Sequence, residues 1–213
     1  EQLDEMALMK RCEKYNCEVP EDVIVLTAGV DTQDNRFEVE VVGWGEGKES
    51  WGIKYAVIYG DLKQAEVWNE LDAFLGQTFT RADGAKLKIL AACMDSGGHF
   101  PNEVYKFCKP RWGRHIYAIK GKGGGEVPYY NRPTKNNPVK CPLFTLGVDT
   151  GKSILLDRLR VELIGENGEH LESAPGYCHF PREKDRGYNL DYFVGLTSER
   201  QIMTYKKGKA VFE

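Results

Sequence analysis

Two aspartates stand at the ends of long apolar runs, where they could act together. Asp31 closes the run VIVLTAGVD, and Asp95 closes the run KLKILAACMD. Such runs are typical of strands buried on both faces, and open α/β sheets place functional groups at the carboxyl ends of these strands. If the two strands are neighbours, the carboxylates meet. Two carboxylates a few ångströms apart repel each other unless a cation neutralises them.

A crevice of this kind suits Mg²⁺ or Mn²⁺, which prefer oxygen ligands and keep bound waters. The chemistry that a two-metal site supports is phosphodiester hydrolysis, in which one ion activates the attacking water and the other stabilises the leaving oxygen. Asp31 and Asp95 are therefore candidate metal ligands and catalytic residues. Taken alone, each aspartate is more typical of a turn or helix cap, and only the match between the two strands favours a metal site.

Two further motifs bear on the chemistry. His99, in DSGGHF, follows Asp95 closely enough to contact the same crevice or a phosphate, although a plain surface histidine explains it equally well. GVDTGKS resembles a phosphate-binding loop. That motif needs four residues between its first glycine and its Gly-Lys-Ser, but only three separate Gly147 from Gly151. The sequence therefore argues against a nucleotide site.

The charges are unevenly distributed along the chain. The net charge is −3, yet residues 101–160 carry 12 Lys and Arg against 4 Asp and Glu, whereas residues 1–100 carry 10 against 19. A basic segment of this kind is expected where one face meets a polyanion, although a solvated surface is the simpler alternative. Residues 121–142, rich in Gly, Pro and Asn, predict a long mobile loop with two tyrosines. The side chains that we predict to hold a nucleic-acid backbone are Lys120, Lys122, Arg132, Lys135, Lys140 and Lys152.

The other elements must position these residues. The apolar spacing predicts a lead-in helix over 3–15, with Leu3, Met6 and Met9 on one stripe, and a helix over 153–163 that Thr150 and Ser153 cap. Three strands over 23–31, 36–45 and 50–61 predict an antiparallel meander. The order of elements predicts an α/β fold: a ribonuclease H-like mixed sheet, antiparallel meander plus parallel strands, with helices on both faces. The remaining elements are expected at 65–79 (helix), 86–98 (strand), 103–108 (helix), 115–121, 143–149 and 176–181 (strands) and 190–203 (helix).

Composition excludes several classes of protein. No stretch approaches the roughly 20 apolar residues that span a bilayer, and the acidic start EQLDEMALMK is unlike a signal peptide. The six cysteines, several in apolar company, indicate reduced thiols of a cytosolic protein. Zinc is not supported, because Cys178 and His179 would point to opposite faces of a strand.

Several stretches, in order, resemble the nuclease half of lambda-type bacteriophage terminase large subunits. They are VIVLTAGVDTQDNRFEVEVVGWGEGKESW, AACMDSGGHFPNEVYKF, YAIKGKGG, GVDTGKSILLDRL and CHFPREKDRGYNLDYFVGLTSER, and together they cover nearly the whole chain. The resemblance implies a ribonuclease H-like endonuclease that cuts concatemeric double-stranded viral DNA with Mg²⁺ or Mn²⁺. It matches Asp31 in GVDTQ and Asp95 in MDSGGH to the first and second metal-binding carboxylates of the family.

The same resemblance implies an organisation and a set of partners. Residues 1–20 are expected to be a lead-in helix and linker from a packaging ATPase domain, and residues 21–213 a nuclease domain truncated at its carboxyl end. The family's third carboxylate has no match, and Asp191 and Glu199 are the nearby acids; Asp191 is also typical of a cap or first-turn acid of the last helix. The implied partners are double-stranded DNA, the terminase small subunit, the portal and procapsid, and the ATPase domain, with no membrane, in the cytoplasm of an infected bacterium.

Two alternatives stay open at this stage. The missing third carboxylate fits a catalytically inactive DNA-binding or docking module of the same fold. A transposase or integrase core would share the fold and the two strand-end aspartates.

Overall fold

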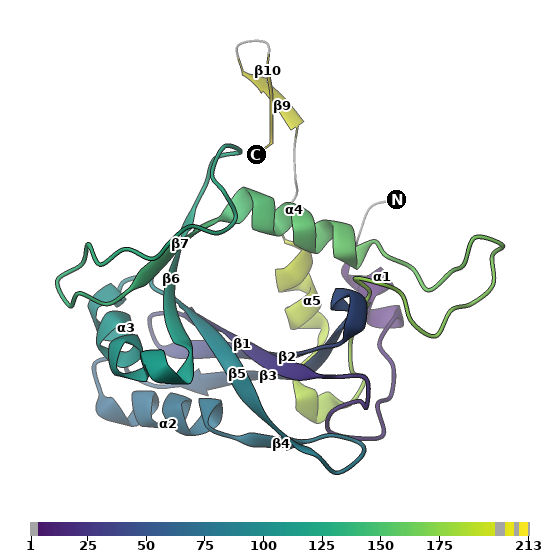
Figure 1. Ribbon diagram of the computed structural model, residues 1–213, viewed down its shortest axis with the longest axis horizontal. Helices are drawn as coiled ribbons and strands as arrows, with labels where there is room; N and C mark the ends of the chain where they lie inside the picture. The colour runs from purple at the N-terminus through teal and green to yellow at the C-terminus, as the bar shows by residue number, and fades with distance from the viewer. Residues whose placement is uncertain (1–3, 199–202, 207–208, 213) are drawn as a thin grey trace.

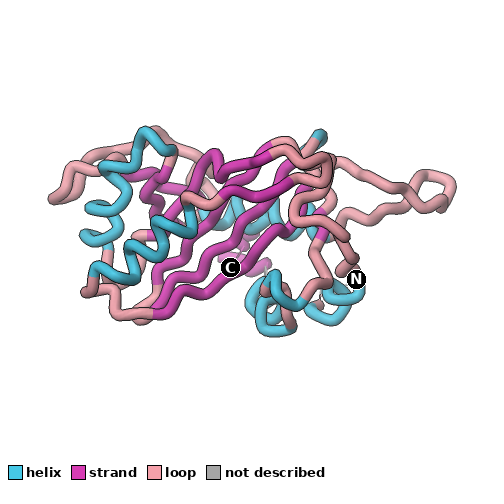
Figure 2. The backbone as a smooth tube through the Cα atoms, turned by 90° about the horizontal axis from the view of Figure 1, so that it is seen from below, coloured by secondary structure: helices cyan, strands magenta, loops and turns pink. Residues whose placement is uncertain are grey.

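The computed structural model describes residues 4–198, 203–206 and 209–212. Its centre is one twisted, mixed sheet in the order β7-β6-β5-β1-β2-β3-β8, with β4 paired to β5 beside this path (Figures 1 and 2). Strands β1, β2 and β3 form an antiparallel meander, and β5, β6 and β7 extend the sheet in parallel from β1. The strands are β1 (Val25–Thr32), β2 (Arg36–Trp44), β3 (Ser50–Tyr59), β4 (Thr78–Thr80), β5 (Lys86–Asp95), β6 (Ile116–Lys122), β7 (Leu143–Gly147) and β8 (Cys178–His179).

Helices lie on both faces of the sheet, as the order of elements predicts (Figure 1). A separate hairpin joins β9 (Met203–Lys206) to β10 (Lys209–Phe212). No described helix has the length and apolar character that crossing a bilayer requires. The helices are α1 (Glu5–Lys10), α2 (Ala65–Leu75), α3 (Pro101–Cys108), α4 (Val148–Leu159) and α5 (Leu190–Thr197), with short 3-10 turns η1 (Glu46–Lys48), η2 (Lys109–Arg114) and η3 (Lys184–Arg186).

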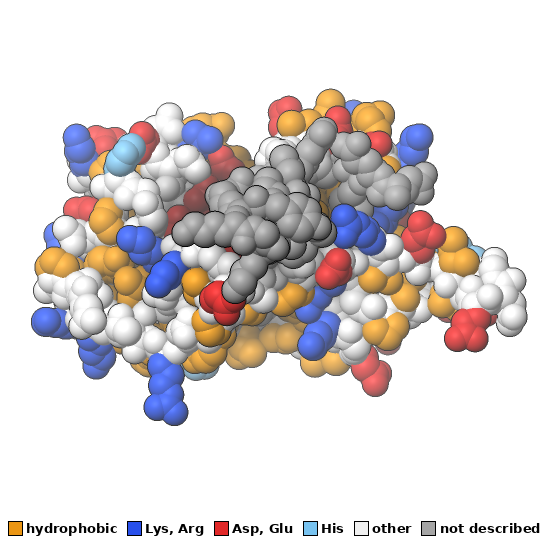
Figure 3. All heavy atoms as spheres, turned by 90° about the horizontal axis from the view of Figure 1, so that it is seen from above, with side chains coloured by type: hydrophobic (Ala, Val, Ile, Leu, Met, Phe, Trp, Pro, Cys, Tyr) orange, Lys and Arg blue, Asp and Glu red, His pale blue; other side chains and the backbone are white. Residues whose placement is uncertain are grey.

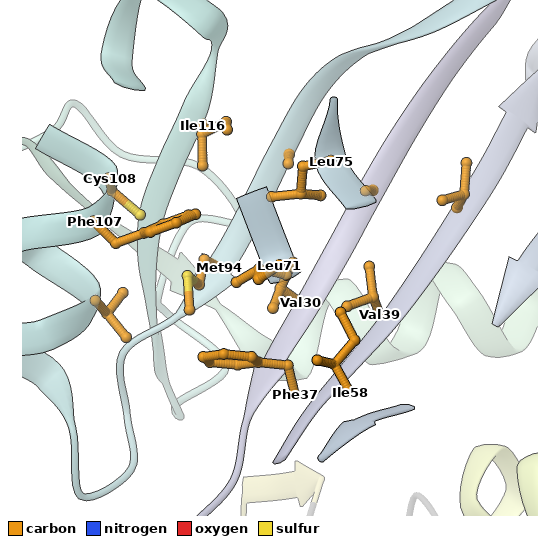
Figure 4. Packing of buried hydrophobic residues seen from close by; sticks show 14 of the residues in the cluster. Val30, Phe37, Val39, Ile58, Leu71, Leu75, Met94, Phe107, Cys108 and Ile116 are labelled. Atoms are coloured by element: carbon orange, nitrogen blue, oxygen red, sulfur yellow. The ribbon is translucent and has the colours of Figure 1, made fainter. Parts of the chain in front are cut away.

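The main core lies between the sheet and helices α2 and α3. Alternate residues of each strand point into it, as Val30 of β1, Phe37 of β2 and Met94 of β5 do (Figure 4). From the helices, Leu71 and Phe107 close the same layer. This alternation turns Asp31 of β1, Glu38 of β2 and Asp95 of β5 to the other face of the sheet, and it is on that face that the candidate site lies.

A second core joins segments far apart in the chain. This core buries Leu8 of α1 together with Phe193 of α5 and with Phe180, which follows β8. Tyr55 of β3 packs against them. The predicted stripe placed Leu3, Met6 and Met9 inward. In the structure Leu8 is the buried residue of α1, and Met6 is 52% exposed. Leu3 lies outside the described residues. The stripe was wrong at Met6, because α1 has only six residues and presents Leu8 to α5, whereas Met9 packs against this core as predicted.

Helix α4 differs from the helix predicted over 153–163. It begins at Val148 with Gly147 as its N-cap, so Thr150 and Ser153 lie inside the helix and cap nothing. Lys152, which the predicted helix would place at its start, accordingly stands in the second turn. The apolar spacing of 153–163 places Ile154, Leu155, Leu159 and Leu163 inward, but half of this face is open to solvent, because α4 lies along the rim of the sheet instead of packing flat on it (Figure 1). Ile154 and Leu155 are exposed, Leu163 is half-buried and Leu159 is buried.

The predicted last helix over 190–203 is also shorter. Helix α5 ends at Thr197, and Met203–Lys206 form a strand of the terminal hairpin. The short strand β4 was missed, because three residues, TFT, carry too little periodicity to be recognised.

Candidate active site

Asp31 and Asp95 lie side by side on neighbouring strands. β1 and β5 pair in parallel with Val30 opposite Met94, so the next residue of each strand is one of the two aspartates. Val30 and Met94 point into the main core, and the aspartates therefore point to the opposite face of the sheet. Helix α2 and the β4 hairpin connect the meander back to β5, which makes this pairing possible. The predicted neighbourhood of the two strands is confirmed.

Local contacts fix the two strand ends. Thr32 Oγ1 donates to the Asp95 carbonyl at 2.9 Å, which ties the end of β1 to the end of β5. The Gly97 N–H donates to Asp95 Oδ1 at 3.1 Å, and Gln33 Nε2 donates to Asp31 Oδ2. These bonds hold one oxygen of each carboxylate and leave the other for a further ligand.

The electrostatics of the pair favour a cation. Burial raises the pKa of Asp95 above its ordinary value, and the charge of Asp31 raises it further, whereas the Gly97 N–H and Lys120 act in the opposite direction. A carboxylate whose ionisation is opposed by burial and by a second carboxylate gains when a positive ion binds. Mg²⁺ in particular is commonly held by one or two carboxylates together with waters and substrate phosphates. The donor set therefore fits a hard divalent cation.

Glu38 of β2 is a site residue that the sequence reasoning missed. It lies directly opposite Asp31 in the antiparallel pair and on the same face. Tyr55 donates to Glu38 Oε2 at 2.6 Å, and Arg36 Nε donates to Oε1 at 2.8 Å. Burial acts to raise the pKa of Glu38, but these two hydrogen bonds outweigh it and hold the pKa below its ordinary value. The alternation of RFEVEVV was the available signal, yet only the register shows that Glu38 faces Asp31.

Asp31 and Asp95 have no third ligating side chain beside them among the described residues. Within the described ranges, no three His, Cys, Asp or Glu side chains are grouped closely enough to hold a metal ion. Glu38 is occupied by Tyr55 and Arg36, and Glu199, named above as a nearby acid, lies outside the described residues. Asp31 and Asp95 are the residues of this edge that could hold a cation.

The two additional candidates lie elsewhere. His99 is 81% exposed at its side chain, and its Nδ1 lies 2.6 Å from Asp34 Oδ1 in the β1–β2 turn rather than against Asp95. Asp191 is exposed in the first turn of α5, where Asn189 caps the helix. Among the described contacts, no hydrogen bond or ion pair joins Asp191 to the two strand-end aspartates.

The predicted basic residues are all exposed, and one of them acts on the carboxylate pair. Lys120 and Lys122 are exposed at the end of β6, and Lys120 is close enough for its charge to lower the pKa of Asp95. In Figure 3, acidic side chains lie in a hollow of the surface, with Lys and Arg side chains on the outer surface nearby. The others are also exposed, along β7 and at α4: Arg132, Lys135, Lys140 and Lys152.

The loop over 121–142 is attached to its neighbours and does not hang free as a mobile arm. The Gly124 N–H donates to Asp149 Oδ2 at 2.8 Å, and two backbone bonds pair Thr134 with Leu143. Gly147 is required here, because a Cβ at this position would meet the Val127 carbonyl oxygen at 2.4 Å. The loop therefore has a defined course along β7 and the start of α4.

Comparison with known proteins shows the family of this chain. The family model described as terminase large subunit gpA, endonuclease domain, matches residues 1–213. The terminase large subunit of Escherichia phage lambda is 33% identical over 209 residues, and that of Enterobacteria phage P21 is 33% identical over 210 residues. Each alignment covers 98% of this chain and 32% of the relative, so the chain spans about a third of the length of these curated relatives.

One solved structure is also similar. It is a mutant nuclease domain of the large terminase subunit gp2 of bacterial virus Sf6, with manganese and beta-thujaplicinol. The sequence identity is 14% and the TM-score 0.47, with 91% of this chain and 79% of that chain covered. The family match extends over the whole chain and leaves the transposase or integrase alternative without support. This chain belongs to the family of terminase large subunit gpA endonuclease domains.

Proposed function

We propose that this chain is a metal-dependent endonuclease that cuts concatemeric double-stranded DNA during viral genome packaging. The observation that carries the proposal is the pair Asp31 and Asp95, side by side at the ends of β1 and β5 in a chain of this family. The two carboxylates would hold Mg²⁺ or Mn²⁺. When bound, such ions activate water and stabilise the leaving oxygen in phosphodiester hydrolysis.

The chain's own residues prepare this site. The Gly97 N–H and Gln33 each orient one carboxylate by holding a single oxygen. Lys120 and Lys122, at the end of β6, lie where they can bind the phosphate backbone beside the carboxylates. The rest of the basic set, Arg132, Lys135, Lys140 and Lys152, extends this surface along β7 and α4. His99 and Asp191 are kept as lesser candidates, because neither contacts the pair in this state.

The wider role belongs to the whole protein, of which this chain corresponds to about a third of the relatives' length. We propose that the remainder supplies a packaging ATPase domain and that residues 1–20 connect to it. The proposed partners are the terminase small subunit, which would select the cut site, and the portal and procapsid. The reaction would take place in the cytoplasm of an infected bacterium.

Two measurements test this function independently. Supercoiled plasmid is incubated with the chain and Mn²⁺ or Mg²⁺ to measure nicking, and Mn²⁺ binding is measured by calorimetry without DNA. Asp31→Asn and Asp95→Asn are each expected to lower metal affinity by more than about 100-fold and to abolish nicking. Asp157→Asn, at an aspartate 72% exposed on α4, is the matched control and should change neither.

The pH dependence gives a further readout. Because the pKa of Asp95 is raised, a proton competes with the cation at a higher pH than at an ordinary aspartate. Mn²⁺ affinity should therefore weaken as the pH falls through that raised pKa. Wild-type chain that binds DNA but neither nicks it nor binds Mn²⁺ would contradict the nuclease and favour the inactive docking module.

A further inference from the structure

Arg36, the first residue of β2, lies at the same edge of the sheet as the two aspartates. Thr32 pairs with Phe37, and the Gln33 N–H donates to the Arg36 carbonyl at 3.0 Å across the tight turn. Phe37 points into the main core, so Arg36 on its neighbouring position points to the face that carries Asp31. An arginine therefore stands next to the carboxylates on the side of β2.

Neighbouring side chains hold the guanidinium in place. Arg36 Nε donates to Glu38 Oε1 at 2.8 Å, and Nη1 donates to Asn35 Oδ1 at 3.2 Å. Glu38 is itself fixed by the hydroxyl of Tyr55 at 2.6 Å. Within the described part of the chain, no hydrogen bond is recorded for Nη2, and the side chain is 34% exposed. The guanidinium is thus pre-oriented, with donors that point away from its two partners.

The position of Arg36 complements that of Lys120. Across this edge the strands stand in the order β6, β5, β1 and β2, with Ile119, Asp95, Asp31 and Glu38 next to one another in the register. Lys120 follows Ile119, and its charge lowers the pKa of Asp95. Arg36 lies two residues from Glu38 on the same face, so one cation stands on the β6 side of the carboxylates and one on the β2 side. A guanidinium binds phosphate in a bidentate manner, and holding it in advance reduces the conformational entropy lost on binding.

We propose that Arg36 binds a DNA backbone phosphate beside the Asp31 and Asp95 pair, on the side opposite Lys120. Glu38 and Asn35 act as positioning residues for its guanidinium. This inference rests on the proposed function, but it concerns the binding of DNA and not its cleavage. It predicts that the DNA backbone crosses the edge of the sheet from β6 to β2.

The test measures DNA binding without divalent metal, by fluorescence anisotropy of short labelled duplexes of two unrelated sequences over a salt series. Arg36→Gln is expected to weaken binding about tenfold on both duplexes and to lower the salt slope by about one, whereas Arg36→Lys keeps the slope. Arg160→Gln is the matched control: Arg160 is also exposed and paired with a carboxylate, Asp157, but lies at the end of α4. It should bind as the wild type does.

Several outcomes would overturn the inference. If Arg36→Gln bound both duplexes as the wild type does, Arg36 would be only a surface ion-pair partner of Glu38. Weakening on one sequence alone would show contact with a base and not with a phosphate. A wild-type chain that bound neither duplex would overturn the proposed function as well, whereas failure of Arg36→Gln alone leaves the nuclease proposal intact. Melting temperatures of all variants check that the fold is kept.

Discussion

At the scale of single residues, His179 is a buried ionisable group outside the candidate site that is held on both sides. It is 6% exposed and lies between two carboxylates, with Nδ1 at 2.8 Å from Glu13 Oε1 and Nε2 at 2.7 Å from Glu49 Oε1. Its ring stacks on Trp51 with centroids 4.8 Å apart. Burial acts to lower the pKa of His179, but the hydrogen bonds that the ring donates to the two carboxylates outweigh it and raise the pKa above 6.5.

The pH dependence of stability should reveal this histidine. Because its folded-state pKa is raised, its contribution is complete below about pH 6.5 and is lost as the pH rises through the raised value. His179→Gln is expected to lower the free energy of unfolding by about 3–5 kcal/mol near pH 6, since Glu49 would stay buried without its cationic partner and would keep only the neutral donors Ser173 and Ala174. Urea unfolding over a pH series measures this. The exposed His170→Gln is the control, and an unaltered pH profile in His179→Gln would contradict the assignment.

At the scale of elements, the segment before β1 is packed as part of the domain. Leu8 of α1 is 1% exposed against α5, and Val19 lies in the main core. Arg182 binds the Cys12 carbonyl through Nε at 3.0 Å and Nη2 at 2.6 Å, which ties this segment to the chain beyond β8. The hydrophobic contacts and these hydrogen bonds act together, so α1 and α5 should unfold with the sheet.

Substitutions in α1 test this packing. Leu8→Ala is expected to lower the free energy of unfolding by about 2–5 kcal/mol, because it leaves a cavity in the second core. Met6→Ala, two residues away and 52% exposed, should change it by no more than about 0.5 kcal/mol. Urea unfolding followed by circular dichroism gives both values. Equal, small effects would show that α1 is only a linker attached to the surface.

At the scale of the whole molecule, the charge pattern follows the sheet. The carboxyl ends of β1 and β5 hold the acidic pair, and the next strand outward, β6, ends in the basic residues Lys120 and Lys122. The opposite edge also carries lysines, Lys86 and Lys88, at the start of β5. Among the described residues, these two lysine pairs carry equal charge, and the pair at the end of β6 lies beside the candidate site, whereas the pair at the start of β5 does not.

Substituting each lysine pair in turn shows whether DNA binding depends on lysines beside the candidate site or only on the net charge of the protein. Lys120→Ala with Lys122→Ala is expected to lower the slope of log affinity against log salt for duplex DNA by about two. The matched double substitution Lys86→Ala with Lys88→Ala should leave the slope unchanged. Anisotropy titrations over a salt series measure both. The same loss in both variants would show that only the overall charge matters.

Much of the candidate site was predictable because it depends on local pattern. A buried strand that ends in an aspartate is visible as an apolar run followed by Asp31 or Asp95, and the helix between them implies parallel neighbours. Glu38 and Arg36 were not found, since their relevance depends on which residue of β2 faces Asp31. A shift of one residue in that register would move both to the other face.

The sequence by itself determined the kind of elements, their order, the mixed sheet and the two strand-end carboxylates, because hydrophobic periodicity and short connections are local properties. The tertiary structure alone decided that Glu38 faces Asp31, that Arg36 stands opposite Lys120 across the pair, and that α4 starts at Val148 with Ile154 and Leu155 exposed. Those features depend on the register between strands and on which surfaces meet. Both are set by contacts between residues far apart in the chain, which no local pattern contains.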